Sequence, residues 1–340
     1  MHERTRKMWA TVAIVVTGLV FSCSSRSSRE GPAGGANARP PDEMARWYQG
    51  CWNSFNEKKW DDFKKCYADR ASSQQVGYGH GYVNGPDAII TASQDFIKTF
   101  PDGRGDAQII LVNENHIASI YLLKGTNTGP ILGINQEELP ITKKKLGLLF
   151  AHYIEVDPAT LKVQKELGIE DGLTLAYQLG YSSIQGRKLM ENGAPVPTIV
   201  FAKNDAAEMK NVETEKAQFE AWNKHNQTAV DSYEADDYIL HDITGPADLT
   251  KAQDAQENKA YWDAFSDARI NTAAIWGAGD YVTAVGTFDG RNDGDIPVYK
   301  IKKTGKRVSL PFIDIFRFEA GKLKEEWLFF DGSALIAQLK

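Results

Sequence analysis

Two aspartates stand in the same local sequence, one in each of two copies of a longer pattern. Asp171 and Asp331 are each followed by a glycine and, further on, by Gln-Leu. Side chains alternate along a strand, so Trp327, Phe329 and Asp331 share one face. If that face lines an apolar pocket, desolvation raises the pKa of the carboxyl until it can both take and give a proton. The alternative role for each aspartate is a cap at the start of a helix or turn.

Other titratable side chains stand where they could line a pocket. Asp314 lies between two isoleucines, and His152 holds the matching position in the first copy. Asp314 is either a pocket acid or a paired structural charge, and His152 is either a pocket residue or a hydrogen-bonded core histidine. His241, at the end of an apolar run, is a pocket residue or a polar group at a strand end. Further pocket-lining candidates are Trp327, Phe288, Asn127, Tyr261 and Trp262, the last two with packing as the alternative.

Several kinds of chemistry find no support in the sequence. No glycine-rich stretch has the spacing of a phosphate-binding loop, and there is no Gly-x-Ser-x-Gly motif. The 6 histidines are scattered singly, without a His-x-x-x-His pair, so we predict no metal site and no cofactor. A net charge of −6 without a basic block argues against binding to nucleic acid.

The N-terminal segment is typical of a processing signal. Residues 1–22 join a basic start to an apolar run too short for the ~20 residues of a membrane-spanning helix. The run ends at Cys23 in a sequence that resembles the bacterial lipobox, whose Cys is lipidated; the alternative is an ordinary secretory signal with an incidental Cys. Residues 23–42 are expected to form a disordered tether. Because Ser24 follows the Cys, the resemblance implies the outer membrane, facing the periplasm, with the lipid as the only contact to the membrane.

Two further cysteines could pair in an oxidising compartment. Cys51 lies on an expected helix, and Cys66 lies near the end of the next one. The periplasm favours disulfides, but a sequence does not give the distance between two Cα atoms. Two alternatives therefore stay open, a disulfide or two small buried hydrophobic side chains.

The same pattern occurs twice, at a separation of roughly 160–170 residues. The matches pair Trp52 with Trp222, Phe100 with Phe265, Gly125 with Gly286, and Asp171 with Asp331. Repeats of this length are duplicated domains rather than solenoid units. We expect one domain at 43–180, a linker at 181–204 and a second domain at 205–340. We also expect the two domains to pair as an internal pseudo-dimer.

Each copy begins with helices and continues with strands. Apolar residues from Met44 to Phe55 follow helical spacing after Asp42, a candidate N-cap, and residues from Met209 to Trp222 do the same in the second copy. Aliphatic and β-branched runs predict strands at 108–112, 117–123, 281–288, 311–318 and 323–330. Helices followed by an antiparallel meander indicate an α+β fold.

Several motifs recur in order in both copies. They include FPDGRGDAQIILVNENHIASIYLLKGTNTGPILG in the first, AWNKHNQTAVDSYEADDYILHD in the second, and the closing Asp of each. Both copies thereby resemble SnoaL-like polyketide cyclases and ester cyclases. The resemblance implies two nuclear transport factor 2-like cones, in each of which a curved antiparallel sheet wraps three helices. It also implies that Asp171 and Asp331 drive an intramolecular aldol closure. Where the family often has His, this chain has Asn127 and Phe288.

These patterns predict a lipid-anchored protein with pockets for small apolar or aromatic molecules. The enzymatic hypothesis is cyclase, isomerase or hydrolase chemistry through Asp331 and Asp171. The alternatives are a non-catalytic carrier or sensor of small ligands, and a structural interaction module of the same fold. A carboxylate inside an enclosed cavity favours catalysis, an apolar cavity without one favours a carrier, and filled cones favour the module.

Overall fold

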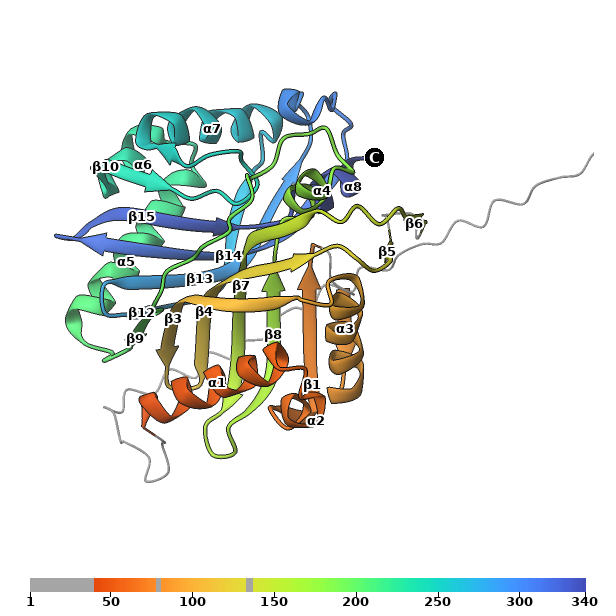
Figure 1. Cartoon of the computed structure of the whole chain (residues 1–340). Helices are drawn as coiled ribbons and strands as arrows, with labels where there is room; N and C mark the ends of the chain where they lie inside the picture. The colour runs from red at the N-terminus through yellow and green to blue at the C-terminus, as the bar shows by residue number, and fades with distance from the viewer. Residues whose placement is uncertain (1–39, 78–80, 133–136) are drawn as a thin grey trace, which may run out of the picture. The chain divides into compact units, whose positions relative to one another are not determined.

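The computed structural model describes residues 40–77, 81–132 and 137–340. The expected signal peptide at 1–22, Cys23 and nearly all of the tether at 23–42 lie outside these residues. No described helix is both long enough and apolar enough to span a lipid bilayer. The described part carries one arrangement of helices and strands twice (Figure 1).

The first repeat builds a sheet beside its helices, which are α1 (Pro41–Asn56), α2 (Trp60–Lys64), α3 (Pro86–Thr99) and α4 (Gly172–Leu179). The sheet strands of this repeat are β1 (Tyr67–Val76), β2 (Gly81–Asn84), β3 (Arg104–Asn113), β4 (His116–Thr126), β7 (Lys145–Asp157) and β8 (Lys162–Ile169). With β9 (Thr198–Phe201), they form a seven-stranded sheet in the order β2-β1-β8-β7-β4-β3-β9. Two short strands, β5 (Ile131–Leu132) and β6 (Glu138–Leu139), pair with each other.

The second repeat has the same order of elements. Its helices are α5 (Ala206–Trp222), α6 (Gln227–Tyr233), α7 (Lys251–Ala264) and α8 (Gly332–Leu339), with a short 3-10 helix at Pro297–Tyr299. Its strands are β10 (Glu234–Leu240), β11 (Leu249–Thr250), β12 (Arg269–Ala278), β13 (Tyr281–Arg291), β14 (Arg307–Glu319) and β15 (Lys322–Phe329). They form a six-stranded sheet in the order β11-β10-β15-β14-β13-β12.

The predicted α+β class, with two nuclear transport factor 2-like cones, is confirmed. Neighbouring strands are mostly antiparallel, as expected, but β1 pairs with β8 and β10 pairs with β15 in parallel. The strand β9 comes from the region expected to be a linker and extends the first sheet parallel to β3. The connection between the repeats is therefore partly built into a sheet.

Each sheet buries one apolar face against its own helices and its other apolar face against the sheet of the other repeat. Tyr48 and Phe100 belong to the helix-side core of the first repeat, and Phe265 and Phe316 belong to that of the second. A third cluster joins the remaining faces of the two sheets. Its fully buried members include Leu111, Ala118, Ala151 and Ile169 from the first repeat and Ala278, Ile313, Ile315 and Phe329 from the second.

Strand alternation decides which side chains of β15 face the helices. Phe329 lies in the cluster between the sheets, and Trp327 packs against that cluster. The face of Trp327 and Phe329 therefore does not line the cone, and the condition for a desolvated Asp331 in that pocket is not met. The opposite face of the strand carries Glu326, which is followed on the same side by Phe330, and both line the cavity beside the helices.

The structure also corrects the alignment of the two repeats near residue 125. A Cβ atom on Gly125 would lie 2.7 Å from the Cβ of Phe100, and one on Gly290 would lie 3.0 Å from the Cβ of Phe265. Each glycine thus makes room for the phenylalanine that ends the preceding helix. Gly290, and not Gly286, is therefore the counterpart of Gly125.

The first helix of each repeat differs in detail from the prediction. Because α1 begins one residue before Asp42, this side chain lies in the first turn and binds Arg46 instead of capping the helix. In α5, Phe219 and Trp222 are buried as expected, but Met209 is 57% exposed. The buried face of α5 is completed by polar side chains instead.

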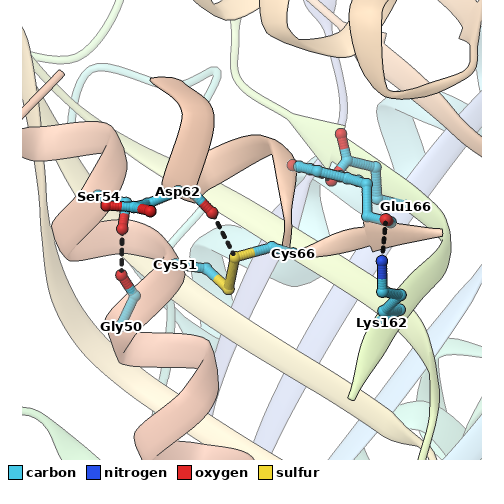
Figure 2. Close-up of a disulfide and its surroundings, with 8 residues drawn as sticks. Gly50, Cys51, Ser54, Asp62, Cys66, Lys162 and Glu166 are labelled. Carbon is cyan, nitrogen blue, oxygen red and sulfur yellow. Dashed lines mark hydrogen bonds between the residues drawn. A yellow bond between two sulfur atoms is a disulfide. The ribbon is translucent and has the colours of Figure 1, made fainter. Parts of the chain in front are cut away.

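Cys51 and Cys66 form a disulfide, which settles the two alternatives left by the sequence. Figure 2 shows the bond joining α1 to the turn between α2 and β1, with the sulfur of Cys66 directed at the backbone carbonyl of Asp62. The two Cα atoms are 6.1 Å apart. The bond fixes both helices against each other at one end of the first repeat.

Asp171 and Asp331 cap α4 and α8 and also join the two repeats. Each carboxyl accepts hydrogen bonds from backbone N–H groups in the first turn of its own helix. Asp171 also accepts one from Gly332 of the second repeat, and Asp331 accepts one from Gly172 of the first, both at 3.0 Å. Burial and the nearby Asp331 carboxylate raise the pKa of Asp171 to about 7. This placement matches the capping alternative for both residues.

Removal of the disulfide should lower the free energy of unfolding by about 3 kcal/mol, because the bond closes a loop of this size in the unfolded chain. The sequence separation of the two cysteines is 15. We expect urea unfolding of the Cys51→Ser, Cys66→Ser double variant to match that of the reduced wild type. A reductant should leave the double variant unchanged. Equal stability of the oxidised wild type and the variant would contradict a structural role for the bond.

Loss of either shared cap should cost more than loss of an ordinary one. Asp205 caps only its own helix, α5, and provides a matched control. We expect Asp205→Ala to cost about 1 kcal/mol, and Asp331→Ala or Asp171→Ala about 2 kcal/mol or more. Because each carboxyl binds the other helix, the two losses should not be additive in a double-mutant cycle. Additive losses of the size seen for Asp205→Ala would contradict the reciprocal contact.

Candidate functional site

A large cavity lies between the sheet and the helices of each repeat. The second-repeat cavity holds about 920 Å³ of space free of atoms and the first-repeat cavity about 930 Å³, part of it open to solvent. Aromatic walls line both. They are Phe219, Trp222, Tyr261, Phe288, Phe312 and Phe330 in the second-repeat cavity, and Trp52, Phe55, Phe63, Phe96 and Phe150 in the first-repeat cavity. Cavities with such a lining suit small apolar molecules.

Two carboxyl groups meet on the sheet side of the second-repeat cavity. Asp314 on β14 and Glu326 on β15 are within hydrogen-bonding reach of each other, and Tyr238 donates to Glu326 Oε2 at 2.6 Å. Burial raises the pKa of Glu326 to about 7. Burial, with the charge of Glu326, raises the pKa of Asp314 well above its ordinary value. The pair can therefore hold a shared proton near neutral pH and act as acid or base.

Further carboxyl groups line the same cavity, namely Glu234, Asp242, Asp254 and Glu257. Burial, with a contribution from the Glu326 carboxylate, raises the pKa of Glu234 to about 8. Burial likewise raises the pKa of Glu257 to about 7. Two cations lie close to these groups: Lys251 Nζ is 4.0 Å from Glu234 Oε2, and Arg187 Nε donates to the backbone oxygen of Asp242 at 2.8 Å. The cavity thus combines aromatic walls with a high density of acidic groups.

In the first-repeat cavity, the polar groups partner one another. Tyr48 Oη lies 2.7 Å from His152 Nδ1, and His152 Nε2 lies 3.1 Å from Glu166 Oε2. Tyr67 and Gln75 also donate to Glu166. Burial acts to raise the pKa of Glu166, but the hydrogen bond and charge of His152 lower it below its ordinary value. This network keeps a carboxylate ionised beside an apolar cavity.

The two polar centres occupy equivalent positions of the two sheets. Counted along the paired strands, His152 corresponds to Asp314, and Glu166 corresponds to Glu326. A histidine therefore faces the glutamate in the first repeat, whereas a second carboxyl faces it in the second. The first pair can balance its own charge, but the second pair must retain a proton or meet a positive group.

Some of the predicted pocket residues line the two cavities, and the others pack or form hydrogen bonds outside them. Those at the walls are Asp314, Phe288 and Tyr261 in the second-repeat cavity and His152 in the first. His241 lies away from both cavities, stacked on Trp327 at 4.9 Å and paired with Asp248 at 3.1 Å. Trp262 packs on His225, with ring centroids 5.1 Å apart. Both interactions are with neighbours in the second repeat.

Asn127 organises a turn and lines neither large cavity. Its Oδ1 accepts a hydrogen bond from the backbone N–H of Thr142 at 2.8 Å, and Asn292 Oδ1 accepts the matching bond from Thr304 at 2.8 Å. Asn292 is therefore the counterpart of Asn127. The prediction that Phe288 holds this position is wrong, because the sequence match used a Gly-Thr pair that lies earlier on the strand.

Asp171 and Asp331 line neither large cavity, since both lie at the helix caps. Glu166 and Glu326, which do line the cavities, are absent from the sequence-based prediction. A signal for them exists in the repeat. The separation of the two glutamates equals that of Asp171 and Asp331.

The acidic groups are not arranged as a metal centre. Within residues 40–77, 81–132 and 137–340, no three His, Cys, Asp or Glu side chains have the geometry to hold a metal ion. The carboxyl groups of the second-repeat cavity come from different elements that surround the space. Such an arrangement suits contact with an organic ligand and proton transfer to or from it.

Comparison with known proteins identifies the family of the chain. The model of the SnoaL-like polyketide cyclases matches residues 42–179 and 214–339, one match in each repeat. AclR from Streptomyces galilaeus is 20% identical over 39% of this chain and 96% of its own, with a TM-score of 0.36.

TsrD from Streptomyces laurentii is 23% identical over 40% of this chain and 96% of its own, with a TM-score of 0.35. IdmH from Streptomyces antibioticus is 18% identical over 38% and 97%, with a TM-score of 0.35. No curated protein matches the chain. Since the two family matches together cover well over half of its length, the chain belongs to the SnoaL-like polyketide cyclase family.

Proposed function

We propose that the second-repeat cavity carries out acid–base chemistry of the cyclase or isomerase class on a small apolar or aromatic carbonyl compound. The observation that carries this proposal is the buried pair of carboxyl groups, Asp314 and Glu326, at the wall of an aromatic cavity. Family membership supports the reaction class.

The pair is suited to both halves of such a reaction. Aldol closure and isomerisation begin with loss of a proton from a carbon next to a carbonyl group. The ionised member of the pair accepts this proton, and the protonated member donates one where negative charge develops. Tyr238 holds Glu326 through its 2.6 Å hydrogen bond. The apolar walls strengthen these interactions by excluding water.

The protonation of the pair sets the pH dependence of the reaction. Because the pKa of Glu326 is about 7, both carboxyl groups are protonated in acid and no base is available. The rate should rise with pH through about 7, as the first proton leaves. At higher pH, ionisation of Asp314 removes the acid, so the rate should fall again.

Substitution of the pair should abolish proton abstraction. We expect the wild type to speed deuterium exchange next to the carbonyl of small aromatic ketones, measured by proton NMR in heavy water. Asp314→Asn and Glu326→Gln should each lower the rate by about 100-fold or more, because an amide replaces the base. Binding of the ketone without any exchange would contradict catalysis and favour a carrier.

The Asp331→Asn variant tests, in the same assay, whether the acid–base group is the Asp314–Glu326 pair or Asp331. This variant should unfold more easily, because it loses part of a shared cap, but its exchange rate should stay near that of the wild type. Loss of exchange in a folded Asp331→Asn variant would return the catalytic role to Asp331.

The first repeat favours a second, non-catalytic role for its cavity. Tyr48, His152 and Glu166 bind one another in a closed network, and further donors reach Glu166. A network of this kind orders the wall of a cavity without requiring turnover. We therefore propose ligand storage or sensing for the first-repeat cavity, with the internal pseudo-dimer holding both cavities in one chain.

We also propose that the chain is anchored in the outer membrane by lipid on Cys23 and faces the periplasm. The Cys at the end of the apolar run supports this proposal, as does the disulfide, which suits an oxidising compartment. Stable anchoring by lipid takes two membrane-binding signals, such as two acyl chains.

Cys23→Ser should therefore move the protein from the membrane fraction to the soluble periplasmic fraction. Its thermal unfolding should match that of the wild-type folded region, because the substitution lies outside both repeats. The measurement is fractionation of cells followed by a high-salt wash. The Cys51→Ser, Cys66→Ser variant, which keeps Cys23, should stay in the membrane. Retention of Cys23→Ser in the washed membrane would contradict the lipid anchor.

A further inference from the structure

The second-repeat cavity has an unbalanced set of charges. Six carboxyl side chains line it, and none of the described residues at its wall is Lys, Arg or His. The first-repeat cavity, of nearly the same size, places His152 against its central glutamate. The excess of acid is thus a property of the second repeat alone and not of the fold.

Buried oxygen atoms in this cavity also lack donors. No N–H or O–H group of the described residues donates to Asp314 Oδ1 or to Glu234 Oε2. Both side chains line the cavity, and each residue is only 3% exposed. Glu215, fully buried nearby, has no donor for either carboxylate oxygen. A buried acceptor without a donor is costly unless a bound group supplies one.

The walls favour an organic cation over a metal ion. No three acidic or histidine side chains among the described residues converge as metal ligands, so the carboxyl groups surround a volume and do not form a point site. Trp222, Tyr261 and Phe288 present aromatic rings to the same space. Aromatic faces and carboxylates together recognise an ammonium group attached to an apolar body.

We propose that the second-repeat cavity selects a small hydrophobic amine in its ammonium form, with Asp314 and Glu326 as counter-ion and the aromatic rings around its apolar part. This inference deepens the proposed function, on which it rests for the identity of the ligand site. A substrate of this class would carry an amine beside its carbonyl group, and the positive charge would make the neighbouring C–H more acidic.

Binding of an ammonium group should release protons from the cavity. The groups that face the pair are Glu215 from α5, Glu234 and Tyr238 from β10, Asp242 after β10, and Asp254 and Glu257 from α7. The cations beside them are Lys251 at Glu234 and Arg187 at Asp242. Burial raises the pKa of each of these carboxyl groups, to about 8 for Glu234 and about 7 for Glu257, so these two retain protons near neutral pH. A bound cation favours their ionised forms, and its affinity therefore rises with pH.

The test compares 2-phenylethylamine with 2-phenylethanol, its neutral analogue, by isothermal titration calorimetry on the folded protein. At about pH 8 we expect the amine to bind about tenfold or more tightly than the alcohol, and at about pH 6 the preference should shrink. Titrations in two buffers of different ionisation heat should show proton release with the amine only. Equal affinities at pH 8, or no proton release, would overturn the proposal without use of any variant.

Variants assign the preference to its residues. Asp314→Asn and Glu326→Gln should remove most of the tenfold preference while the alcohol still binds. The matched control is Glu325→Gln, because Glu325 is adjacent in sequence but pairs with Arg317 on the opposite face of β15. A preference that survives both cavity substitutions would overturn the proposal. Amine preference without ketone exchange would contradict only the catalytic proposal, and exchange without amine preference would contradict only this one.

Discussion

Both sheets must bury two apolar faces, and this constraint governs the rest of the structure. Because successive side chains point to opposite faces, every strand divides its residues between the helices and the other repeat. Ile313 and Ile315 go to the cluster between the sheets, so Asp314 must face the helices. The acidic centre of the second repeat is thus positioned by the hydrophobic residues on either side of it.

The same constraint explains the fate of the two closing aspartates. At the end of β15, Phe329 is committed to the contact between sheets, and the chain turns into α8 directly afterwards. Asp331 therefore lies where the two repeats meet, beside the start of α4. Since the duplication places Asp171 at the same point of the first repeat, each carboxyl can bind the N-terminus of the opposite helix. Asp171 and Asp331, which match the catalytic position of the resembled family, thus connect the two domains through hydrogen bonds.

The sequence could predict what depends on local pattern. The repeat, the order of helices and strands, and the shared position of His152 and Asp314 follow from spacing along one chain. It could not predict what depends on register between strands. A match of Gly125 to Gly286 is locally plausible, and only the room made for Phe100 and Phe265 identifies Gly290. Glu326 was missed for the same reason, since a shift by one residue exchanges the faces of a strand.

The two cavities show how one fold can diverge in chemistry while its architecture stays constant. Their volumes and aromatic walls are similar, and both centres keep a glutamate at the same position. In the first repeat the glutamate faces His152, whose positive charge can balance it. In the second repeat it faces Asp314, so the pair must keep a proton to avoid two negative charges. When no cation is bound, the carboxyl groups around the second-repeat cavity avoid a build-up of negative charge by staying protonated. The charge of this cavity is therefore set by pH and by its ligand. The electrostatic state of each cavity is therefore determined less by the fold than by the one side chain that faces the common glutamate.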